Sequence, residues 1–483
     1  MRILINSNLI NILIFTLIPM ENLNKIFDVI VVGAGTGGSI AARFAAKKGL
    51  KVCLIDRKDK KDIGNKICGD AVGTEIFDFL KINHPKDDEF SCRIKGAKLY
   101  SPDQKKCIDL TDPKQAGYII NRLEFGQRLL NEAINSGVDQ FLDKTLVLDL
   151  LYDNNSVNGI KVKLNNGDKV DLHSKILIDA SGFYSPLRKR TRGILVEKEI
   201  SKEDSILCYR EIVKFSPRDL EIKNPDYITI ILNQDKAPGG YIWYFPKNES
   251  SVNIGLGTYM DLKGKVKSLY RQNVFNEFIK TSTYEIVSSG GGVVPVRRPL
   301  WSCADDGIMF IGDAACQVNP LHGGGIDPSM RGGFFAAKTA VAAIEKEDFS
   351  VKALWNYNYS VMTSFGAEFA SLDLLRMTLQ VLSNEELNFA LKQDLFSGKE
   401  ILEISSTGEF ELPLLSMVSK AFKGITRPNL LLDLNYLRIR MNEISKLYKN
   451  FPLNVAQFDE WKNRAIQIYD KIKKMLINTK KGK

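Results

Sequence analysis

The most regular pattern of apolar and polar positions lies near the start of the chain, over residues 27–57. A β-branched apolar run at 29–32 is followed by a turn with three glycines and an alanine-rich stretch of helical character. A second apolar run at 52–55 ends at Asp56. This order of strand, glycine-rich turn, helix and strand with a terminal carboxylate predicts a βαβ unit of the kind that binds dinucleotides.

Each glycine of this turn has its own expected role. Gly33 permits the tight turn, Gly35 lets the backbone approach a pyrophosphate, and Gly38 lets the helix pack close to the strand. The N-terminus of the helix then presents its free N–H groups and dipole to the phosphates. Asp56 has the spacing from which a carboxylate accepts the ribose 2′-hydroxyl. This stretch alone does not distinguish NAD from FAD.

A second pattern of the same kind lies late in the chain. An apolar run at 307–311 leads into Gly312 and Asp313, a glycine-rich loop follows at 323–325, and a small-residue helix is expected at 328–344. This order also builds an anion site at a helix N-terminus. Because two such sites can hold the two ends of one large cofactor, the pair favours FAD.

Two residues between these patterns are candidates for the site. Cys68 lies in the unusual stretch 67–71, between a basic loop and a helical pattern, and is either a buried structural cysteine or a thiol near the cofactor ring. Arg122 lies where a strand runs into an amphipathic helix over 118–130, and it either reaches a cofactor phosphate or is a solvated helix start.

Residues 145–180 have the alternation of a β-meander. Four strands are expected there, at 146–151, 160–164, 169–172 and 176–178.

A change in composition marks 196–287 as a separate region with a broad antiparallel sheet. Its expected strands include 227–232, 241–245 and 252–258. The middle strand carries three aromatic residues at period two, which share one face as either core or a pocket wall. They are Tyr241, Trp243 and Phe245.

The patterns predict an α/β chain with a discontinuous cofactor-binding domain over 26–195 and 288–349. An antiparallel β domain for the substrate is expected over 196–287, and a helical region over 350–483.

The first residues, 1–25, are expected to be an extension outside these domains. Their apolar run at 10–18 is too short to span a bilayer. We expect either an over-long start, with Met20 as the true first residue, or a weak interfacial segment.

Composition narrows the class of partner. The chain has 483 residues, with 44% hydrophobic and 26% charged, which is ordinary for a globular protein. Its net charge of +10 comes without a dense basic run interleaved with aromatics, so nucleic acid is not expected, whereas an anionic membrane surface is. Seven cysteines and three histidines show no metal-ligand spacing, so no metal is expected, and the odd cysteine number suits a reducing compartment.

The order of these motifs resembles the FAD-binding fold of p-hydroxybenzoate hydroxylase-type flavoproteins. That order runs from the first glycine turn through Arg122 and the stretch 179–182 to Asp313 and its glycine loop. Finer features resemble the geranylgeranyl reductases, and most closely the archaeal digeranylgeranylglycerophospholipid reductases. They are Cys68-Gly69-Asp70, the Tyr-x-Trp-x-Phe-Pro element at 241–246, and the run GDAACQVNPLHGGGID.

The resemblance implies a fold, a cofactor and roles for residues. The fold is α/β, with a Rossmann-like FAD-binding domain, an antiparallel-sheet substrate domain and a C-terminal helical region. Asp313 would bond the ribitol, and the backbone of 323–326 would face the pyrimidine end of the flavin. Cys68 would lie near the flavin as the catalytic candidate, and the three aromatics would shape a lipid pocket. The implied cofactor-binding residues are Gly33, Ala34, Gly35, Gly38, Asp56, Arg57, Cys68, Gly69, Arg122, Asp313, Gly324, Gly325 and Ile326.

The resemblance further implies saturation of isoprenoid double bonds on a geranylgeranyl lipid by reduced flavin. The sequence has no second nucleotide fingerprint, so electrons would come from a ferredoxin-like protein or NAD(P)H. The net charge and the basic tail at 471–483 fit a cytoplasmic enzyme that is peripheral on the inner face of the membrane. Two alternatives stay open: a flavin monooxygenase of the same fold, and a prenyl-binding protein without redox chemistry.

Overall fold

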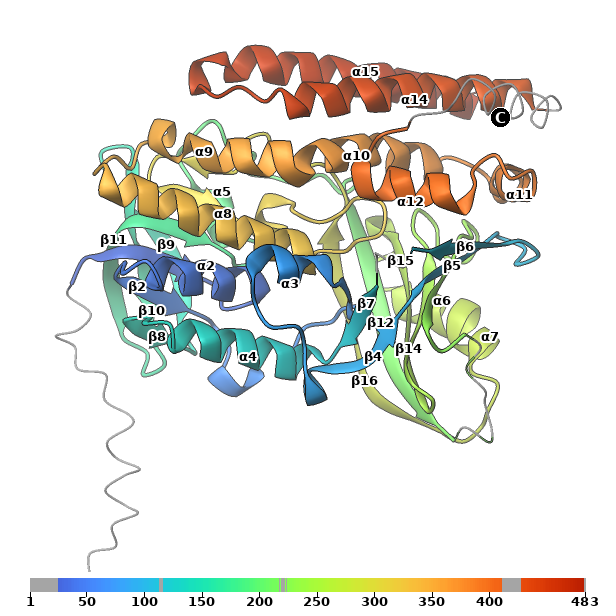
Figure 1. Ribbon diagram of the computed structural model, residues 1–483, viewed down its shortest axis with the longest axis horizontal. Helices are drawn as coiled ribbons and strands as arrows, with labels where there is room; N and C mark the ends of the chain where they lie inside the picture. The colour runs from blue at the N-terminus through green and yellow to red at the C-terminus, as the bar shows by residue number, and fades with distance from the viewer. Residues whose placement is uncertain are drawn as a thin grey trace, which may run out of the picture.

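The computed structural model describes residues 25–112, 116–216, 218, 222, 224–410 and 427–481. The expectations for 1–24 lie outside this part of the chain, as do residues 482 and 483 of the basic C-terminal tail (471–483). Figure 1 shows two large sheets side by side, with helices layered over them and a long helix pair farthest from the sheets.

The first sheet carries the βαβ unit. Its strands lie in the order β17 (Ala304–Asp305), β18 (Ile308–Phe310), β11 (Lys169–Asp179), β1 (Phe27–Val32), β2 (Val52–Ile55) and β8 (Gln140–Leu142), with β10 (Ser156–Lys163) and β9 (Leu146–Asp153) extending β11. The pairs of β1 with β2 and β11 are parallel, and β1 is apolar along most of its length because helices cover it.

Helix α2 (Thr36–Ala46) packs against α8 (Ile326–Glu345) over this sheet (Figure 1). A Cβ on Gly333 would lie 2.3 Å from the carbonyl oxygen of Gly37, so the two helices approach at backbone distance. This close contact places the N-termini of both helices at one end of the sheet.

The meander differs from expectation in one respect. The two strands expected at 169–172 and 176–178 are one strand, β11. Its first part pairs antiparallel with β10 and its last part pairs parallel with β1 and β18. The polar residues between the expected strands do not break the strand because pairing with β10 runs to His173 and pairing with β1 begins at Ser174, so one partner takes over where the other ends.

The second sheet is antiparallel apart from one parallel pair. Its order is β16 (Tyr284–Pro295), β12 (Ser205–Phe215), β15 (Ser251–Tyr259), β14 (Ile242–Asn248), β13 (Tyr227–Ile231), β5 (Gly96–Tyr100) and β6 (Cys107–Thr111). Strands β5 and β6 come from within the range assigned to the cofactor-binding domain, and β16 reaches beyond 287. The pairing of β5 with β13 satisfies the backbone groups of an otherwise open sheet edge, which explains the difference.

A small sheet and several helices connect these layers. The small sheet is β3 (Ala71–Gly73), β7 (Gly117–Ile120) and β4 (Phe90–Ile94). Connecting helices are α3 (Glu75–Leu80), α4 (Arg122–Ile134), α5 (Pro186–Arg190), α6 (Val266–Tyr270) and α7 (Asn276–Phe278).

The C-terminal part is helical, as the sequence predicts. Its helices are α9 (Val351–Val361), α10 (Ala367–Leu379), α11 (Asn384–Lys392), α12 (Gly398–Thr407), α14 (Pro428–Lys449) and α15 (Phe458–Lys481). Helices α9 and α10 lie between α8 and the α14–α15 pair (Figure 1). Among the described residues, no helix is both long enough and apolar enough to span a membrane.

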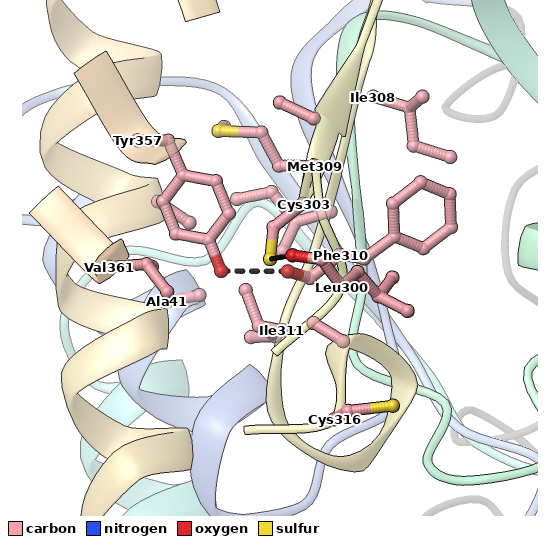
Figure 2. Packing of buried hydrophobic residues seen from close by; sticks show 14 of the residues in the cluster. Ala41, Leu300, Cys303, Ile308, Met309, Phe310, Ile311, Cys316, Tyr357 and Val361 are labelled. Atoms are coloured by element: carbon pink, nitrogen blue, oxygen red, sulfur yellow. Dashed lines mark hydrogen bonds between the residues drawn. The ribbon is translucent and has the colours of Figure 1, made fainter. Parts of the chain in front are cut away.

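The main core joins the first sheet to these helices (Figure 2). Ile308, Met309 and Phe310 of β18 are fully buried, and α9 places Tyr357 beside them. The Tyr357 hydroxyl donates a 2.7 Å hydrogen bond to the backbone oxygen of Phe310. This bond anchors the strand that leads into Asp313.

Candidate active site

In the first glycine turn, Gly33 and Gly38 are crowded by neighbouring backbone atoms, whereas the space beside Gly35 is open. Gly33 has φ +102°, and a Cβ there would lie 2.5 Å from the Ala180 oxygen. A Cβ on Gly38 would lie 1.8 Å from the Gly33 oxygen, whereas one on Gly35 would meet no atom within 4 Å. Gly33 and Gly38 are therefore required by the fold, and Gly35 leaves room for a ligand beside the start of α2.

Asp56 holds the same turn. One carboxylate oxygen accepts a 2.8 Å hydrogen bond from the Ala34 amide, and the other accepts one of 2.8 Å from the Lys58 amide. Each oxygen keeps a second lone pair for a ribose hydroxyl. Arg57, the next residue, is exposed.

Arg122 is the first residue of α4, as its position in the sequence predicts. Its Nε and Nη1 atoms are buried and have no hydrogen-bond partner among the described residues. A guanidinium remains charged in proteins, and burying its donors unpaired is costly. These two donors, the open space at Gly35 and the N-terminus of α2, which lacks a side-chain cap, fit a dinucleotide phosphate.

The second glycine-rich loop is organised by Asn319. Its backbone oxygen accepts a 2.9 Å hydrogen bond from the Gly323 amide, and its own amide donates one of 3.0 Å to the Gly324 oxygen. Helix α8 begins at Ile326, and Gly325 precedes it without a side-chain cap. The first amides of α8 are thus free to donate to a polar edge of the flavin.

Asp313 lies against this loop. A Cβ on Gly325 would lie 3.5 Å from its Oδ1, and its Oδ2 is 2.9 Å from Nζ of Lys66. Lys66 belongs to the basic loop after β2, so this ion pair joins the early and late cofactor patterns. Sequence reasoning did not identify Lys66, because a lysine in a charged loop gives no local signal.

Tyr241 joins the second sheet to the glycine-rich loop. Its hydroxyl donates a 2.6 Å hydrogen bond to the backbone oxygen of His322. The His322 ring accepts a 3.1 Å hydrogen bond from the Gly324 amide, and partial desolvation by the loop lowers the pKa of His322, although the residue keeps an exposed surface. A neutral ring at physiological pH keeps the Nδ1 lone pair available for this amide.

Cys68 is half-buried between the two sheets. Its Sγ accepts a 3.3 Å hydrogen bond from the Asp70 amide, and it packs against the apolar cluster that contains Ile326. A Cβ on Gly69 would lie 2.9 Å from the Phe245 ring. The structure therefore brings the Cys68 loop, the start of α8 and the aromatic strand together.

The aromatic face has two parts. Trp243 and Phe245 are each 6% exposed and pack with Ile94 and Ile119, so they belong to a small core. Tyr241 is half-buried and lies at the end nearest the glycine-rich loop.

A buried polar network that sequence reasoning missed supports the Cys68 loop. Asn253 donates to the Cys68 oxygen at 2.8 Å and to Asp70 Oδ2 at 2.9 Å, and it accepts a 3.0 Å hydrogen bond from the Trp243 indole. Nζ of Lys247 lies 3.5 Å from the same Asp70 oxygen. One carboxylate thus connects the loop, the aromatic strand and a buried lysine.

A lane of small residues, defined as Gly255 and Gly257 of β15 with Gly290 and Gly292 of β16, lies beside the aromatic face. In the sheet register, Cys208 of β12 lies between Gly292 and Gly257. Two residues further along β12, Arg210 lies between Gly290 and Gly255. The glycines of β15 and β16 were visible in the sequence, but their alignment across three strands follows only from the register.

Family models match both halves of this arrangement. A model described as FAD dependent oxidoreductase matches residues 28–183, and one described as geranylgeranyl reductase catalytic domain matches residues 204–294.

Curated relatives match most of the chain. A digeranylgeranylglycerophospholipid reductase of Sulfolobus acidocaldarius is 33% identical over 93% of this chain and 99% of its own length. One of Methanothrix thermoacetophila is 34% identical over 75% of this chain and 89% of its own length.

Solved structures agree with these matches. A geranylgeranyl bacteriochlorophyll reductase-like protein of Thermoplasma acidophilum has a TM-score of 0.72 and 26% identity, over 86% of this chain and 99% of that chain. A flavin-dependent brominase with a TM-score of 0.63 and 19% identity, over 83% of this chain and 100% of that chain, shares the fold. The expected α/β flavoprotein fold and FAD are confirmed, and the chain belongs to the geranylgeranyl reductase family of FAD-dependent oxidoreductases.

Proposed function

We propose that this chain saturates the isoprenoid double bonds of geranylgeranyl membrane ether lipids. The observation that carries the proposal is the meeting of three parts: the Cys68 loop, the glycine-rich loop before α8, and an apolar strand with a lane of small residues beside it. An aromatic face beside glycines suits a long prenyl chain, since each buried CH₂ contributes roughly 0.8 kcal/mol.

The cofactor residues divide by the end of FAD that they would hold. Gly35, Asp56 and Arg122 suit the ribose and phosphates, and Asp313 suits the ribitol. The amides at the start of α8 would stabilise negative charge at the pyrimidine end. When bound and reduced, FAD supplies a hydride from N5 to one alkene carbon.

The other alkene carbon needs a proton and a fixed position. We assign both tasks to the loop of Cys68, whose thiol is half-buried against the start of α8. The amide of Asp70 donates to Sγ and fixes its direction, while Phe245 and Trp243 exclude water from the other side. An isolated alkene is a weak hydride acceptor, so this positioning would contribute much of the rate.

The Cys68→Ala variant tests this assignment. We expect single-turnover alkene reduction to slow at least tenfold, while FAD affinity changes little, because on this proposal the thiol would lie beside the flavin and away from the phosphates. Cys107→Ala, at an exposed cysteine, is the matched control. Unchanged single-turnover reduction in Cys68→Ala would contradict the role.

The decisive experiment for the function is anaerobic reduction of the purified holoenzyme followed by a geranylgeranyl lipid. Mass spectrometry should show the lipid gaining mass in two-dalton steps. A hydroxylated product formed in step with oxygen uptake would support the monooxygenase instead. Isolation without FAD and without redox turnover would support a prenyl-binding protein.

We further propose an external electron donor and a membrane surface as partners. Beyond the FAD site the sequence has no second dinucleotide fingerprint, so a ferredoxin-like protein or transiently bound NAD(P)H would supply the electrons. The basic end of α15 would dock on anionic headgroups at the cytoplasmic face of the membrane. To distinguish the two donors, each is mixed with the oxidised holoenzyme and the loss of flavin absorbance is measured. The physiological donor is the one that reduces the flavin.

A further inference from the structure

Arg210 lies in the middle of β12, on the face of the sheet that carries the aromatic residues. A Cβ on Gly255 would lie 2.4 Å from the Trp243 ring and 2.7 Å from the Arg210 Cβ. The side chains of Arg210 and Trp243 therefore leave the sheet on the same face. This face meets the Cys68 loop, since a Cβ on Gly290, the register partner of Arg210, would lie 2.6 Å from Ile67.

Among the described residues, no carboxylate oxygen lies within the 4.0 Å of an ion pair from the Arg210 guanidinium. The side chain is 3% exposed, and its Nη1 donates a 2.8 Å hydrogen bond to the hydroxyl of Ser288. Its Nε is buried without an acceptor. Because a guanidinium stays protonated, this position holds a buried cation that one neutral hydroxyl compensates only in part.

Other buried arginines of this protein have either a carboxylate partner or several backbone acceptors. Arg188 donates to three backbone oxygens. Arg298 pairs with Glu197, and Arg376 pairs with Asp373. Arg210 thus departs from the pattern of its own fold.

The open space on the face of Arg210 lies at Gly292. The space over its two register partners is filled, by the Trp243 ring at Gly255 and by Ile67 at Gly290. A Cβ at Gly292, one position further along the same face of β16, would meet no atom within 4 Å. Near Gly290 the closest atom is the terminal Cδ1 of Ile67, the flexible end of a side chain that can rotate away.

We propose that Arg210 binds a phosphate oxyanion, and that this phosphate belongs to the prenyl lipid. The proposal rests on the proposed function, because it assigns the polar end of that substrate. A phosphate supplies two or more oxygen acceptors for the planar fork of a guanidinium, together with the missing negative charge. Held there, it would set how far the prenyl chain extends along the aromatic face past Cys68.

The first test measures phosphate binding without turnover. Inorganic phosphate should raise the melting temperature of the FAD-loaded wild type and of Arg93→Gln, an exposed arginine on β4. It should not raise that of Arg210→Gln, and Arg210→Lys should give a smaller rise. In FAD-loaded protein, we expect the cofactor phosphates to occupy Arg122, so the rise in melting temperature reports phosphate binding at Arg210. An equal shift in Arg210→Gln would overturn the site.

The second test distinguishes lipid phosphate from free phosphate. For Arg210→Gln, kcat/KM should fall roughly 10- to 100-fold with geranylgeranyl phosphate, as for loss of a charge-assisted hydrogen bond, and less than threefold with geranylgeraniol. An equal fall with both substrates would overturn the proposal. If inorganic phosphate raises the melting temperature only when Arg210 is present, but Arg210→Gln lowers kcat/KM equally for both substrates, the site binds free phosphate and the lipid assignment is overturned.

Failure of the function and failure of this site are separable. If the wild type reduces neither lipid, the proposed function fails, and the melting experiment still decides whether Arg210 binds phosphate. If Arg210→Gln does not fold, Arg210→Lys carries both comparisons, because lysine keeps the charge but loses the planar fork.

Discussion

Two glycines of one turn differ in what an added methyl group would meet. At Gly38 it would penetrate the Gly33 backbone oxygen, 1.8 Å away, and at Gly35 it would meet nothing within 4 Å. Gly35 also has φ −68°, which alanine adopts freely. The same substitution should therefore damage the fold at one position and ligand binding at the other.

We expect Gly38→Ala to destabilise the apoprotein by about 3 kcal/mol or more, in the range of severe packing changes. Gly35→Ala should leave the apoprotein's melting temperature within about 2 °C and weaken FAD binding at least tenfold, because the methyl fills ligand space. Thermal melts of apoprotein and flavin fluorescence titrations measure the two effects. A stable Gly38→Ala protein with normal FAD affinity would contradict the packing argument.

Glu368 on α10 is a carboxyl whose charge is disfavoured. Burial raises its pKa to about 8, and the negative charge of Asp327 adds to the effect. Its Oε1 accepts a 3.1 Å hydrogen bond from the side-chain amide of Asn319, the residue that organises the glycine-rich loop. Ionisation of Glu368 would therefore place a charge directly behind this loop.

The sign of the pH effect follows from the raised pKa. Between the ordinary value near 4.5 and about 8, the folded protein holds a proton that the unfolded chain has released, so stability falls as pH rises through this window. At pH 9, Glu368→Gln should be more stable than wild type by on the order of 5 kcal/mol, and at pH 4 nearly equal. Melting temperatures from pH 4 to 9 test this, and parallel curves for the two proteins would contradict it.

At the scale of elements, Asp70 connects strands that are far apart in sequence. Its carboxylate contacts Asn253 on β15 and Lys247 on β14, and its backbone oxygen accepts a 2.9 Å hydrogen bond from the Ile120 amide at the end of β7. Its φ of +72° lies in the left-handed region, where asparagine is also tolerated. Asp70→Asn therefore removes the charge without new backbone strain.

We expect Asp70→Asn to destabilise the protein by about 3 kcal/mol, because it leaves Lys247 buried and unpaired. Alkylation of Cys68, followed by peptide mass mapping, should become faster as its loop loosens. The double variant Asp70→Asn with Lys247→Met should regain stability, because it no longer buries an unpaired charge. Its Cys68 should still be alkylated faster than in wild type. Asp226→Asn removes an exposed partner of Lys95 and serves as the control, with a change below about 1 kcal/mol.

The elements that could be predicted from the sequence are those whose pattern lies within one short window of the chain. The βαβ unit and α8 have apolar spacing and glycines that are informative within one window, and both form as expected. The pairing of β5 with β13 and the continuity of β11 depend on neighbours distant in the chain, so no local window contains them.

The same distinction holds for residues of the site. The packing role of Gly38 could be predicted because its closest neighbour, Gly33, is five residues away, whereas the residue that crowds Gly33, Ala180, is distant in the chain. A charged residue in a strand suggests a solvent-facing position, and only the register places Arg210 between two glycines. Lys66 and Asp313 are likewise paired by the tertiary fold alone.

At the scale of the whole molecule, the outer helix pair carries charge and apolar side chains at one end. Thr479 of α15 donates to Asp433 of α14 at 2.9 Å, which places the end of α15 beside the start of α14. Lys473 and Lys474 are exposed near this end, and Ile477 is 53% exposed. Exposed lysines beside an apolar side chain are typical of a surface that contacts anionic lipid.

We expect the double variant Lys473→Gln and Lys474→Gln to bind anionic liposomes about 30-fold more weakly, since each lysine near such a surface contributes roughly 1 kcal/mol. Co-sedimentation at low salt measures the change. Lys47→Gln with Lys48→Gln removes the same charge from an exposed site at the end of α2 and should have a smaller effect. Equal losses in both double variants would indicate a response to net charge alone.

The placement of the β5–β6 hairpin has a consequence for synthesis of the chain. The hairpin leaves the ribosome well before β13, its parallel partner, because all of β7 to β12 is made in between. At about 5–20 residues per second, its outer edge waits on the order of ten seconds for that partner. During this interval the unpaired edge is open to other nascent chains, so growth temperature and chaperone supply should govern the yield of this enzyme more than its final stability does.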